Sequence, residues 1–424
     1  MFIGAPSLGY VADRYGRWSS LLLSTGIICY FGILSAASPS YPWMLLTRGT
    51  VGFSIGGLVA SSSTLTAEFM PAKYRAKGII LMIAFWTLGG LFEVLIAMLV
   101  LPRLGWRWLL VLTATPLIAT LPAFLWLPRS PRFLIASGKP EAALEVINRV
   151  ARINGKPELT QPIKSTGKAE RGNIKAIFHG WRYSITSILL FFIWFVCGFI
   201  YYGAVLLSSE ILRYPHRCLQ DRSQMSEIDS RRLDPSCCHT FTQEDYNSML
   251  IATAGEILNL LWNFLLLDCI GRKFTLLFNL MCSGLFFILL DLCIPVTGTN
   301  VFLFFLRSFT NAAFVTSYVY TTEVYPTQIR TLAGGLCSSM SRVGAMSTPF
   351  VAQVLIPDYS VLVALLVYMS VSVAGGIASA VLPIETRGRG LLQTVEDESE
   401  DIELREQLEV ANSSGYSTFD KKDT

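Results

Sequence analysis

Long apolar stretches separated by short polar connections make up most of the chain. Ten of these stretches have about 20 residues each, the length that a helix needs to cross a hydrocarbon core about 30 Å thick. Unpaired backbone amide groups are costly in lipid, so the stretches predict transmembrane helices. Their number and length argue against buried helices of a large soluble protein. The predicted spans are residues 19–37, 42–67, 78–101, 108–127, 184–208, 247–267, 274–295, 301–323, 332–355 and 361–383.

Polar residues between these spans recur at a spacing of 255 residues. D-R-Y-G-R at Asp13–Arg17 is answered by D-C-I-G-R at Asp268–Arg272, and L-P-R-S-P-R at Leu127–Arg132 by L-P-I-E-T-R at Leu382–Arg387. A third correspondence joins Glu68, Pro71 and Arg75 to Glu323, Pro326 and Arg330. A repeat of this length predicts an all-α membrane protein built from two related helical bundles.

The repeated motifs resemble those of a known family. G-Y-V-A-D-R-Y-G-R-W at Gly9–Trp18 is similar to the loop between helices two and three of major facilitator transporters, and the second copy at Asp268 lies where that family repeats it. Three further segments resemble synaptic vesicle 2-related proteins and their organic-ion transporter relatives: L-P-R-S-P-R-F-L-I-A-S-G-K-P-E-A-A-L, Y-V-Y-T-T-E-V-Y-P-T-Q-I-R and L-P-I-E-T-R-G-R-G-L. The resemblance covers nearly the whole chain and implies a major facilitator fold of two six-helix pseudo-repeats. Arg129 stands where relatives usually show Glu, and Cys269 where they often show Arg.

The duplication also predicts the domain boundaries. Residues 184–256 have no counterpart before Met1, and Met1–Tyr10 as a helix would rise only about 15 Å. We therefore expect a twelve-helix design that starts within its second helix and has about ten full spans plus a partial one. The expected parts are an incomplete N-terminal half-bundle at 1–127, a cytosolic loop with an interfacial helix at 128–183, a six-helix bundle at 184–383 with a non-cytosolic loop at 209–246, and a disordered acidic cytosolic tail at 384–424.

Composition and charge narrow the function. Hydrophobic residues make up 52% of the chain and charged residues 15%, which is typical of a multi-pass membrane protein of a vesicle or the plasma membrane. Lys and Arg gather in the connections that carry the repeat motifs, so we expect these motifs and the C-terminal tail in the cytosol. A net charge of +4 indicates no nucleic-acid partner. The sequence shows no nucleotide-binding loop, metal-ligand set or nucleophile–base arrangement, so we expect neither an enzyme nor a cofactor, and transport without ATP.

Opposite charges lie at corresponding helix ends of the two repeats. In the first repeat, Asp13 and Arg17 could pair with Arg75 and Glu68. The equivalent set in the second repeat is Asp268, Arg272, Glu323 and Arg330. Such clusters could close the cytosolic side in one state and separate in the other, which makes them candidate gating residues. The alternative is that they only anchor helix ends.

Charged residues inside the spans point to a site, because each is costly there unless it faces a cavity or a partner. Arg342 is the candidate for holding an anionic group, since a guanidinium offers paired donors that match a carboxylate. Its alternative role is a buried partner for Glu256 or Glu93, and either acid could carry a coupling proton. Arg307 and Asp291 fall closer to the ends of their spans, which favours a structural role.

Aromatic and small polar residues complete the candidate site. Tyr201 and Tyr318 belong to a set that would line the central cavity in this family, with Trp86, Trp194, Tyr202 and Tyr320. They could stack on a planar or cationic substrate, or serve only in packing. Asn259, Asn263, Asn311, Ser338 and Ser339 could bind substrate by hydrogen bonds or join helix to helix.

The resemblance and the candidate residues lead to one main hypothesis. The chain is expected to be a secondary active transporter of small organic ions that works by alternating access, with a preference for carboxylates because of Arg342. Its expected partners are the substrate, the bilayer and, as a further candidate, a coupling proton. The alternatives are a transporter-like binding or vesicle trafficking protein that moves no substrate, and an inactive truncated isoform.

Overall fold

Every predicted span falls on a helix in the computed structural model of the 424-residue chain. The structure describes residues 1–70, 75–160, 177–178, 180–213, 242–292, 294–325, 329–355 and 361–387. The N-terminal half contains α1 (Gly4–Tyr15), α2 (Arg17–Ala36), α3 (Tyr41–Phe69), α4 (Arg75–Leu104) and α5 (Trp106–Thr120), which continues as the 3₁₀ segment η2 (Leu121–Leu125). Two short helices follow, α6 (Pro131–Ala136) and α7 (Pro140–Ile153). The C-terminal half contains α9 (Gly180–Arg213), α11 (Gln243–Cys269), α12 (Arg272–Leu289), α13 (Val296–Val324), α14 (Arg330–Pro349) with the π-helical segment η3 (Phe350–Leu355), and α16 (Val361–Val381).

Helix boundaries follow local sequence signals. Proline occupies the first turn of α3, where its missing N–H costs no hydrogen bond. At the start of α11 the side chains of Thr242 and Asp245 each accept a hydrogen bond from the other's backbone N–H, which forms a capping box. Pro349 lies at the end of α14, and the helix widens into η3 at the next residue. Gly16 and Gly271, which correspond in the two repeats, both have φ 97°, so the turns before α2 and α12 match in backbone conformation.

Two of the predicted spans differ from the others in composition. Among the described residues, eight helices are long and apolar enough to cross a membrane, whereas α13 and α14 are too polar by the same measure. In α13 the polar side chains of Ser308, Thr310, Asn311 and Thr316 are buried inside the protein. Such a helix tolerates polar residues because protein, and not lipid, surrounds it.

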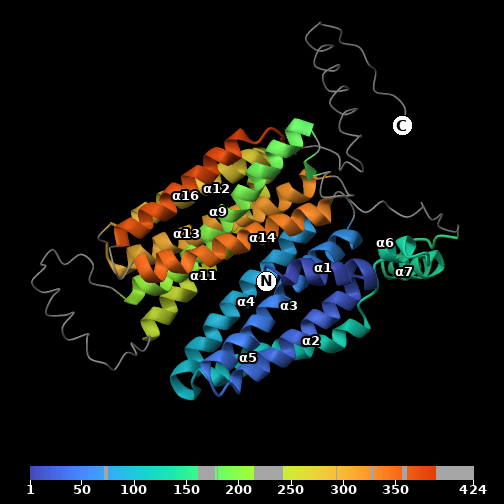
Figure 1. Ribbon diagram of the computed structural model, residues 1–424, viewed down its shortest axis with the longest axis horizontal. Helices are drawn as coiled ribbons and strands as arrows, with labels where there is room; N and C mark the ends of the chain where they lie inside the picture. Colours follow the sequence, from blue (N-terminus) through green and yellow to red (C-terminus); the bar gives the residue numbers. More distant parts are fainter. Residues whose placement is uncertain are drawn as a thin grey trace, which may run out of the picture.

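The helices form two bundles that lie side by side (Figure 1). In the N-terminal half, α2 packs between α3 and α5, and α1 packs on α3. In the C-terminal half, α9 packs on α13, α14 and α16, while α12 packs on α13 and α16. The two halves meet mainly where α4 packs along α11, with smaller contacts from α1 to α14 and from α4 to α13.

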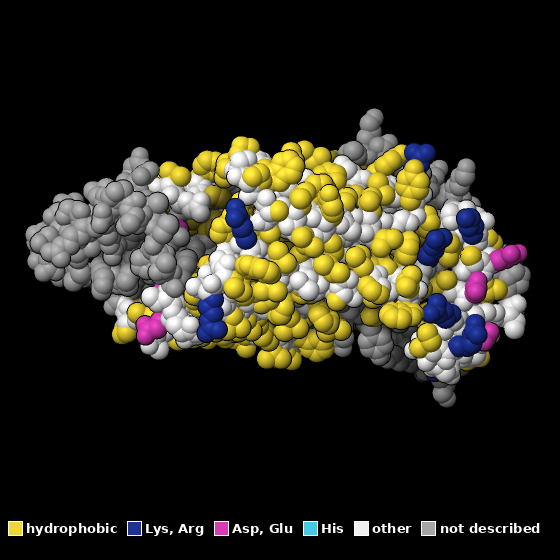
Figure 2. All heavy atoms as spheres, turned by 90° about the horizontal axis from the view of Figure 1, so that it is seen from below, with side chains coloured by type: hydrophobic (Ala, Val, Ile, Leu, Met, Phe, Trp, Pro, Cys, Tyr) yellow, Lys and Arg dark blue, Asp and Glu magenta, His cyan; other side chains and the backbone are white. Residues whose placement is uncertain are grey.

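The surface fits a membrane environment. Figure 2 shows hydrophobic side chains over the middle of one face, with Lys and Arg toward its ends. Large apolar side chains such as Leu81, Phe85 and Leu99 on α4 are exposed. Lipid would cover such residues, because soluble proteins rarely expose apolar surface of this extent.

Several expectations fall on residues that the structure does not describe or reach only in part. The sequence predicts one disulfide to Cys218 in the non-cytosolic loop, with either Cys237 or Cys238 as its partner. These three cysteines lie outside the described residues, as does the tail from residue 388. Within the predicted segment 209–246, α9 continues to Arg213 and α11 begins at Gln243. The predicted helix at 140–154 is present as α7, where Ala143 is fully buried, and its place at the membrane surface stays a prediction.

Candidate functional site

A buried ion pair lies where α4 of the N-terminal half packs on α11 of the C-terminal half. Glu256 on α11 is 2% exposed, and its Oε1 lies 2.8 Å from Nη2 of Arg307 on α13. Arg307 is 7% exposed and also donates to the Thr253 hydroxyl over 3.5 Å. A buried charge pair costs desolvation free energy on both sides, so it needs further hydrogen bonds to be maintained.

Three more side chains donate hydrogen bonds to the Glu256 carboxylate. Asn311 Nδ2 lies 3.0 Å from Oε2, the Tyr201 hydroxyl 3.3 Å from Oε1, and the Thr87 hydroxyl 3.4 Å from Oε2. Four helices therefore meet at one carboxylate: α4, α9, α11 and α13. The donors stabilise a negative charge where lipid and apolar side chains would otherwise exclude it.

The contacts to α4 cross from one half to the other. Thr87 belongs to the N-terminal half, and so does Trp86, whose indole N–H donates to the Tyr201 hydroxyl over 3.1 Å. Tyr201 in turn donates to Glu256 and lies 6.0 Å from the Arg307 guanidinium, measured to its ring centroid. Any relative movement of the halves here would change the set of donors around Glu256.

The expectation that Arg307 would reach the end of its helix is wrong. The sequence placed it early in a span that starts at residue 301, but α13 starts at Val296 and continues beyond Arg307 to Val324. Arg307 therefore lies about 16 Å along the helix from Val296. It is buried there, and its partner is Glu256. Asp291 does lie at a helix end, just after α12 stops at Leu289, and it is exposed.

Arg342 on α14 occupies a neighbouring position. It is 8% exposed, and its Nη1 donates to the Tyr202 hydroxyl over 2.8 Å. Among the described residues, no carboxylate forms an ion pair with Arg342, so the expected alternative of a pair with Glu256 or Glu93 is not what the structure has. The contact described for its guanidinium is with a neutral phenol, which carries no charge to balance its own.

An aromatic cluster connects the two arginine positions. The ring centroids of Tyr201 and Tyr202 lie 5.2 Å apart, those of Tyr201 and Phe314 5.7 Å, and those of Phe314 and Tyr318 5.4 Å. Trp194 packs edge-on against Tyr318 at 4.4 Å. Such rings present apolar faces beside charged groups, an arrangement that suits an organic ion.

Other candidate residues fall elsewhere. Glu93 is exposed on α4, and no described hydrogen bond or ion pair joins it to the Glu256 cluster. Asn263 donates to the side chain of Asn259 over 2.7 Å and to the backbone of Ala312 over 3.1 Å. Asn263 therefore joins α11 to α13, while its bond to Asn259 lies within α11. Asn311, in contrast, belongs to the site.

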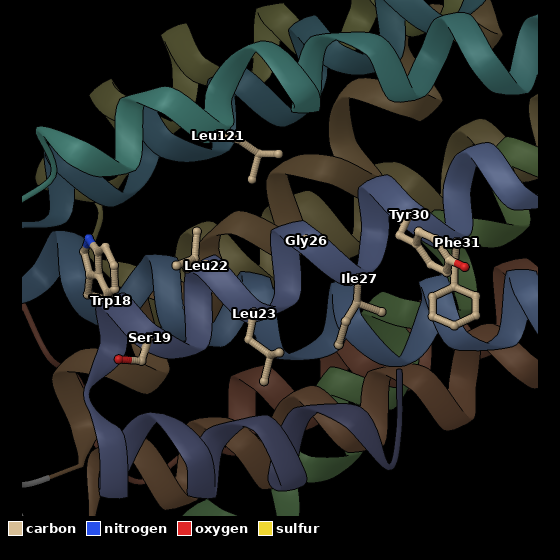
Figure 3. Close-up of a pocket in the computed structure, with 9 residues that line it drawn as sticks. All are labelled: Trp18, Ser19, Leu22, Leu23, Gly26, Ile27, Tyr30, Phe31 and Leu121. Carbon is tan, nitrogen blue, oxygen red and sulfur yellow. The ribbon is translucent and has the colours of Figure 1, made fainter.

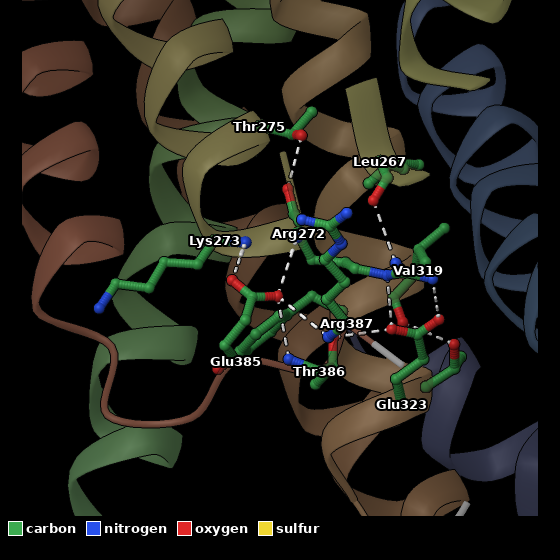
Figure 4. A network of polar contacts seen from close by, with 12 residues as sticks. Leu267, Arg272, Lys273, Thr275, Val319, Glu323, Glu385, Thr386 and Arg387 are labelled. Carbon is green, nitrogen blue, oxygen red and sulfur yellow. Dashed lines mark hydrogen bonds and ion pairs between the residues drawn. The ribbon is translucent and has the colours of Figure 1, made fainter. Parts of the chain in front are cut away.

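At the end of the bundle that carries the repeat motifs, which we call the motif end, each half contains an ion pair. Arg17 Nε lies 3.4 Å from Glu68 in the first half. In the second half, Arg272 uses two nitrogens on Glu323, at 2.8 and 3.0 Å (Figure 4). Both pairs join helices of the same half, α2 to α3 and α12 to α13. The side chains of Asp13, Arg75, Asp268 and Arg330 lie outside the described part of the chain.

One residue of this network was missed from the sequence. Glu385, just after α16, accepts hydrogen bonds from the backbone N–H groups of Arg272 and Lys273 at the start of α12, at 3.0 and 3.1 Å. A carboxylate at a helix N-terminus is favourable because it meets unpaired N–H groups and the positive end of the helix dipole. The L-P-I-E-T-R repeat was the signal, but Glu385 has no acidic counterpart in the first half, where Ser130 stands.

The groups described at this site are ones that can carry charge. Glu256 can bind a proton, and Arg307 and Arg342 can bind an anion. In the described part of the chain, no three His, Cys, Asp or Glu side chains are grouped so that they could hold a metal ion.

Comparison with known proteins places these features in a family. The family model described as "Sugar (and other) transporter" matches residues 1–215, and the model "Major Facilitator Superfamily" matches residues 247–411. The synaptic vesicle 2-related protein of Xenopus laevis is 42% identical over 399 residues, which are 93% of this chain and 71% of that protein. A human protein named putative transporter SVOPL is 38% identical over 393 residues, 91% of this chain and 78% of its own length.

A solved transporter structure has a similar fold. The xylose transporter XylE from E. coli, in a partially occluded inward-open conformation, superposes with a TM-score of 0.61 over 92% of this chain and 86% of that one, at 16% identity. That likeness is one of fold. On the family models and the synaptic vesicle 2-related proteins together, the chain belongs to the major facilitator superfamily, a family of membrane transporters and not of enzymes.

Proposed function

We propose that this chain is a secondary active transporter of small organic ions that works by alternating access and is coupled to protons through Glu256. One observation carries the proposal: a carboxylate that is 2% exposed, deep in a membrane bundle, receives hydrogen bonds from both halves of the molecule. Intramembrane acids of this kind are typical of proton relays in transporters.

Alternating access requires contacts that differ between two states. The hydrogen bonds from Thr87 to Glu256 and from Trp86 to Tyr201 cross the interface, so rocking of the halves would break them. Glu256 would then lose donors that stabilise its negative charge, and binding of a proton would compensate. Proton occupancy and the position of the halves are thereby linked.

The ion pair with Arg307 would also link proton binding at Glu256 to binding of an anion. When Glu256 binds a proton, its neutral carboxyl no longer balances the guanidinium 2.8 Å away. An anionic group of the substrate would restore the balance. Proton and anion would then be carried together, with the net charge at the ion pair unchanged.

Arg342 favours a carboxylate-bearing substrate. Its described contact is with a neutral hydroxyl, so donors of its guanidinium remain for a planar anion. The aromatic cluster of Tyr201, Tyr202, Phe314 and Tyr318 would contact the organic part of the substrate. The excess of Lys and Arg at the motif end supports a cytosolic position for that end and for the C-terminal tail, in a vesicle or the plasma membrane.

Uptake into proteoliposomes tests the proposal. Organic anions, zwitterions and cations are offered with and without a proton gradient directed into the vesicles. We expect anions to accumulate when the gradient is present. Glu256→Gln is expected to abolish gradient-driven accumulation while exchange of labelled for unlabelled substrate continues, because exchange needs no release of the proton. Glu93→Gln, on an exposed residue of α4, is the matched control and should behave as the wild type.

Two outcomes would contradict the proposal. Undiminished gradient-driven accumulation by Glu256→Gln would exclude Glu256 as the coupling group. Failure of the wild type to move any member of the panel, in protein that is folded and oriented in the vesicles, would favour the non-transporting binding or trafficking protein.

A further inference from the structure

An apolar groove of about 700 Å³ runs along the outer face of α2 (Figure 3). Its floor and walls include Trp18, Leu22, Leu23, Gly26 and Phe31 of α2, and Leu121 of η2 closes the other side. Trp18 and Phe31 are 13 residues apart on one helix, so the groove extends about 20 Å. That length exceeds the depth of one leaflet, which is half of a hydrocarbon core about 30 Å thick.

The groove is separate from the central ion pair. α2 packs against α1, α3, α5 and η2, all in the N-terminal half, whereas Glu256 and Arg307 lie on helices of the other half. The open side of the groove faces outward, where the helices are expected to meet lipid. A transported substrate held between the halves would not reach it.

A positively charged side chain, Arg129, lies at the motif end of the groove. The indole N–H of Trp18 donates to the backbone carbonyl of Phe124 over 3.1 Å, which fixes the ring, and the Arg129 guanidinium lies 5.6 Å from the centre of that ring. Arg129 is exposed, and no carboxylate among the described residues forms an ion pair with it. Arg14 and Arg132 are also exposed near this end of the N-terminal half, while Glu68 is occupied by Arg17.

The two repeats differ in the side chain that covers the turn at the motif end. At its motif end, the Glu385 carboxylate covers Gly271 and the start of α12. At the corresponding Gly16, the ring of Phe133 occupies that space, and Ser130, which corresponds to Glu385, is buried as the N-cap of α6. The first repeat therefore has an uncompensated arginine beside an apolar groove where the second has a bound carboxylate.

We propose that this groove and Arg129 bind an anionic phospholipid of the leaflet at the motif end, with one acyl chain along α2 and the phosphate at Arg129. An apolar groove about as long as an acyl chain, with a guanidinium at its motif end, matches both parts of such a lipid. A choline lipid would bring its own cation against Arg129, so the charge favours a lipid with net negative charge. The site lies outside the transport pathway and does not depend on the proposed substrate.

Binding of individual lipids to the purified full chain tests the proposal, with native mass spectrometry as the readout and phosphatidylglycerol and phosphatidylcholine as the probes. We expect the wild type to bind the first phosphatidylglycerol several-fold more tightly than phosphatidylcholine. Arg129→Gln should weaken phosphatidylglycerol binding about fivefold, since one basic residue near a membrane surface contributes about that factor. Phosphatidylcholine, whose choline offsets its phosphate charge, should be weakened less. Arg129 is exposed and follows the last helix of the half, so this variant should retain its fold.

Gly26→Phe tests the groove itself. A Cβ at Gly26 would meet no other atom within 4 Å, so a phenyl ring can fill the groove without disturbing α2. Gly49→Phe on α3 is the matched control, because a Cβ there also meets nothing within 4 Å and Gly49 does not line the groove. Gly26→Phe should weaken first-site binding of both lipids, and Gly49→Phe should leave it unchanged.

Three results would overturn the proposal. Equal affinity of the wild type for the two lipids would remove the role of charge. Identical binding by Gly26→Phe and Gly49→Phe would remove the role of the groove. A monomer from Gly26→Phe where the wild type is a dimer would assign the groove to a second copy of the chain instead.

Discussion

Glu256 and Arg307 show how a membrane protein maintains two opposite charges out of water. The pair has a separation of 2.8 Å and both side chains are less than 10% exposed, so neither charge is screened by solvent. Asn311, Tyr201 and Thr87 occupy the remaining lone pairs of the carboxylate. Removal of one charge therefore leaves the other without compensation, and removal of both does not.

The stability of single and double variants measures this difference between removing one charge and removing both. Arg307→Met alone is expected to destabilise the protein by about 3–5 kcal/mol, the usual cost of leaving a buried charge unpaired. Combined with Glu256→Gln, the same substitution should cost much less, because the unpaired carboxylate is gone. Thermal unfolding of the wild type, both single variants and the double variant in one detergent gives the comparison. Additive losses in the double variant would show that the two groups do not interact.

Replacement of Arg342 is expected to change substrate binding and not the stability of the protein. Its guanidinium contacts the Tyr202 hydroxyl and carries no described ion pair, so its removal leaves no buried carboxylate behind. Arg342→Ala should raise the KM for a carboxylate substrate by tenfold or more, since hydrogen bonds to charged groups contribute about 1.5–3 kcal/mol. The KM for the amide analogue of that substrate should change far less. An equal rise for both analogues would mean that Arg342 serves packing alone.

At the scale of helices, the C-terminal half depends on close approach of backbones. A side-chain carbon at Gly198 on α9 would overlap the backbone carbonyl of Ser341 on α14, and one at Gly344 would overlap that of Phe195. Small residues at helix crossings permit such contact, which supplies much of the packing between helices in lipid. The long helix α9 can therefore lie directly against α14 along its length.

A larger residue at this crossing should separate the helices. Gly198→Leu is expected to lower the yield of folded, monodisperse protein strongly, because a backbone carbonyl cannot move aside as a flexible side chain can. Gly9→Leu, on α1, is the control, since a Cβ there meets nothing within 4 Å. Size-exclusion profiles of both variants after extraction give the answer. Similar profiles for the two would mean that α9 and α14 can part at little cost.

The motif-end pairs belong to this scale as well. Arg17–Glu68 and Arg272–Glu323 each join two helices of the same half, and Thr386 adds a hydrogen bond of 2.7 Å to Glu323. Contacts of this kind hold helix ends together within a half. A gate between the halves needs pairs that cross the interface, so the gating role of these residues stays a prediction that rests on the repeat.

At the scale of the molecule, the helices were predictable and their partners were not. Apolar length and the 255-residue repeat located the ten long helices, eight of which are apolar enough to cross a membrane among the described residues. Glu256 was found because charges are rare inside spans. Its pairing with Arg307 was not, since it depends on how α11 and α13 pack, and the five residues by which α13 starts earlier than predicted moved Arg307 from a helix end to the interior.

The last prediction concerns movement at the interface between the two halves. On α4, a Cβ at Gly90 would lie 3.6 Å from the side chain of Thr253 on α11, so Gly90→Cys with Thr253→Cys should form a disulfide across the interface. If the halves rock against each other during transport, oxidation should stop uptake and reduction should restore it. The matched control is Gly284→Cys with Ser372→Cys, whose side chains would lie 3.5 Å apart between α12 and α16 of one half. That bond should leave uptake intact, because α12 and α16 move together. Uptake that continues through an oxidised Gly90–Thr253 bridge, verified by mass spectrometry, would rule out relative movement of the halves at this point.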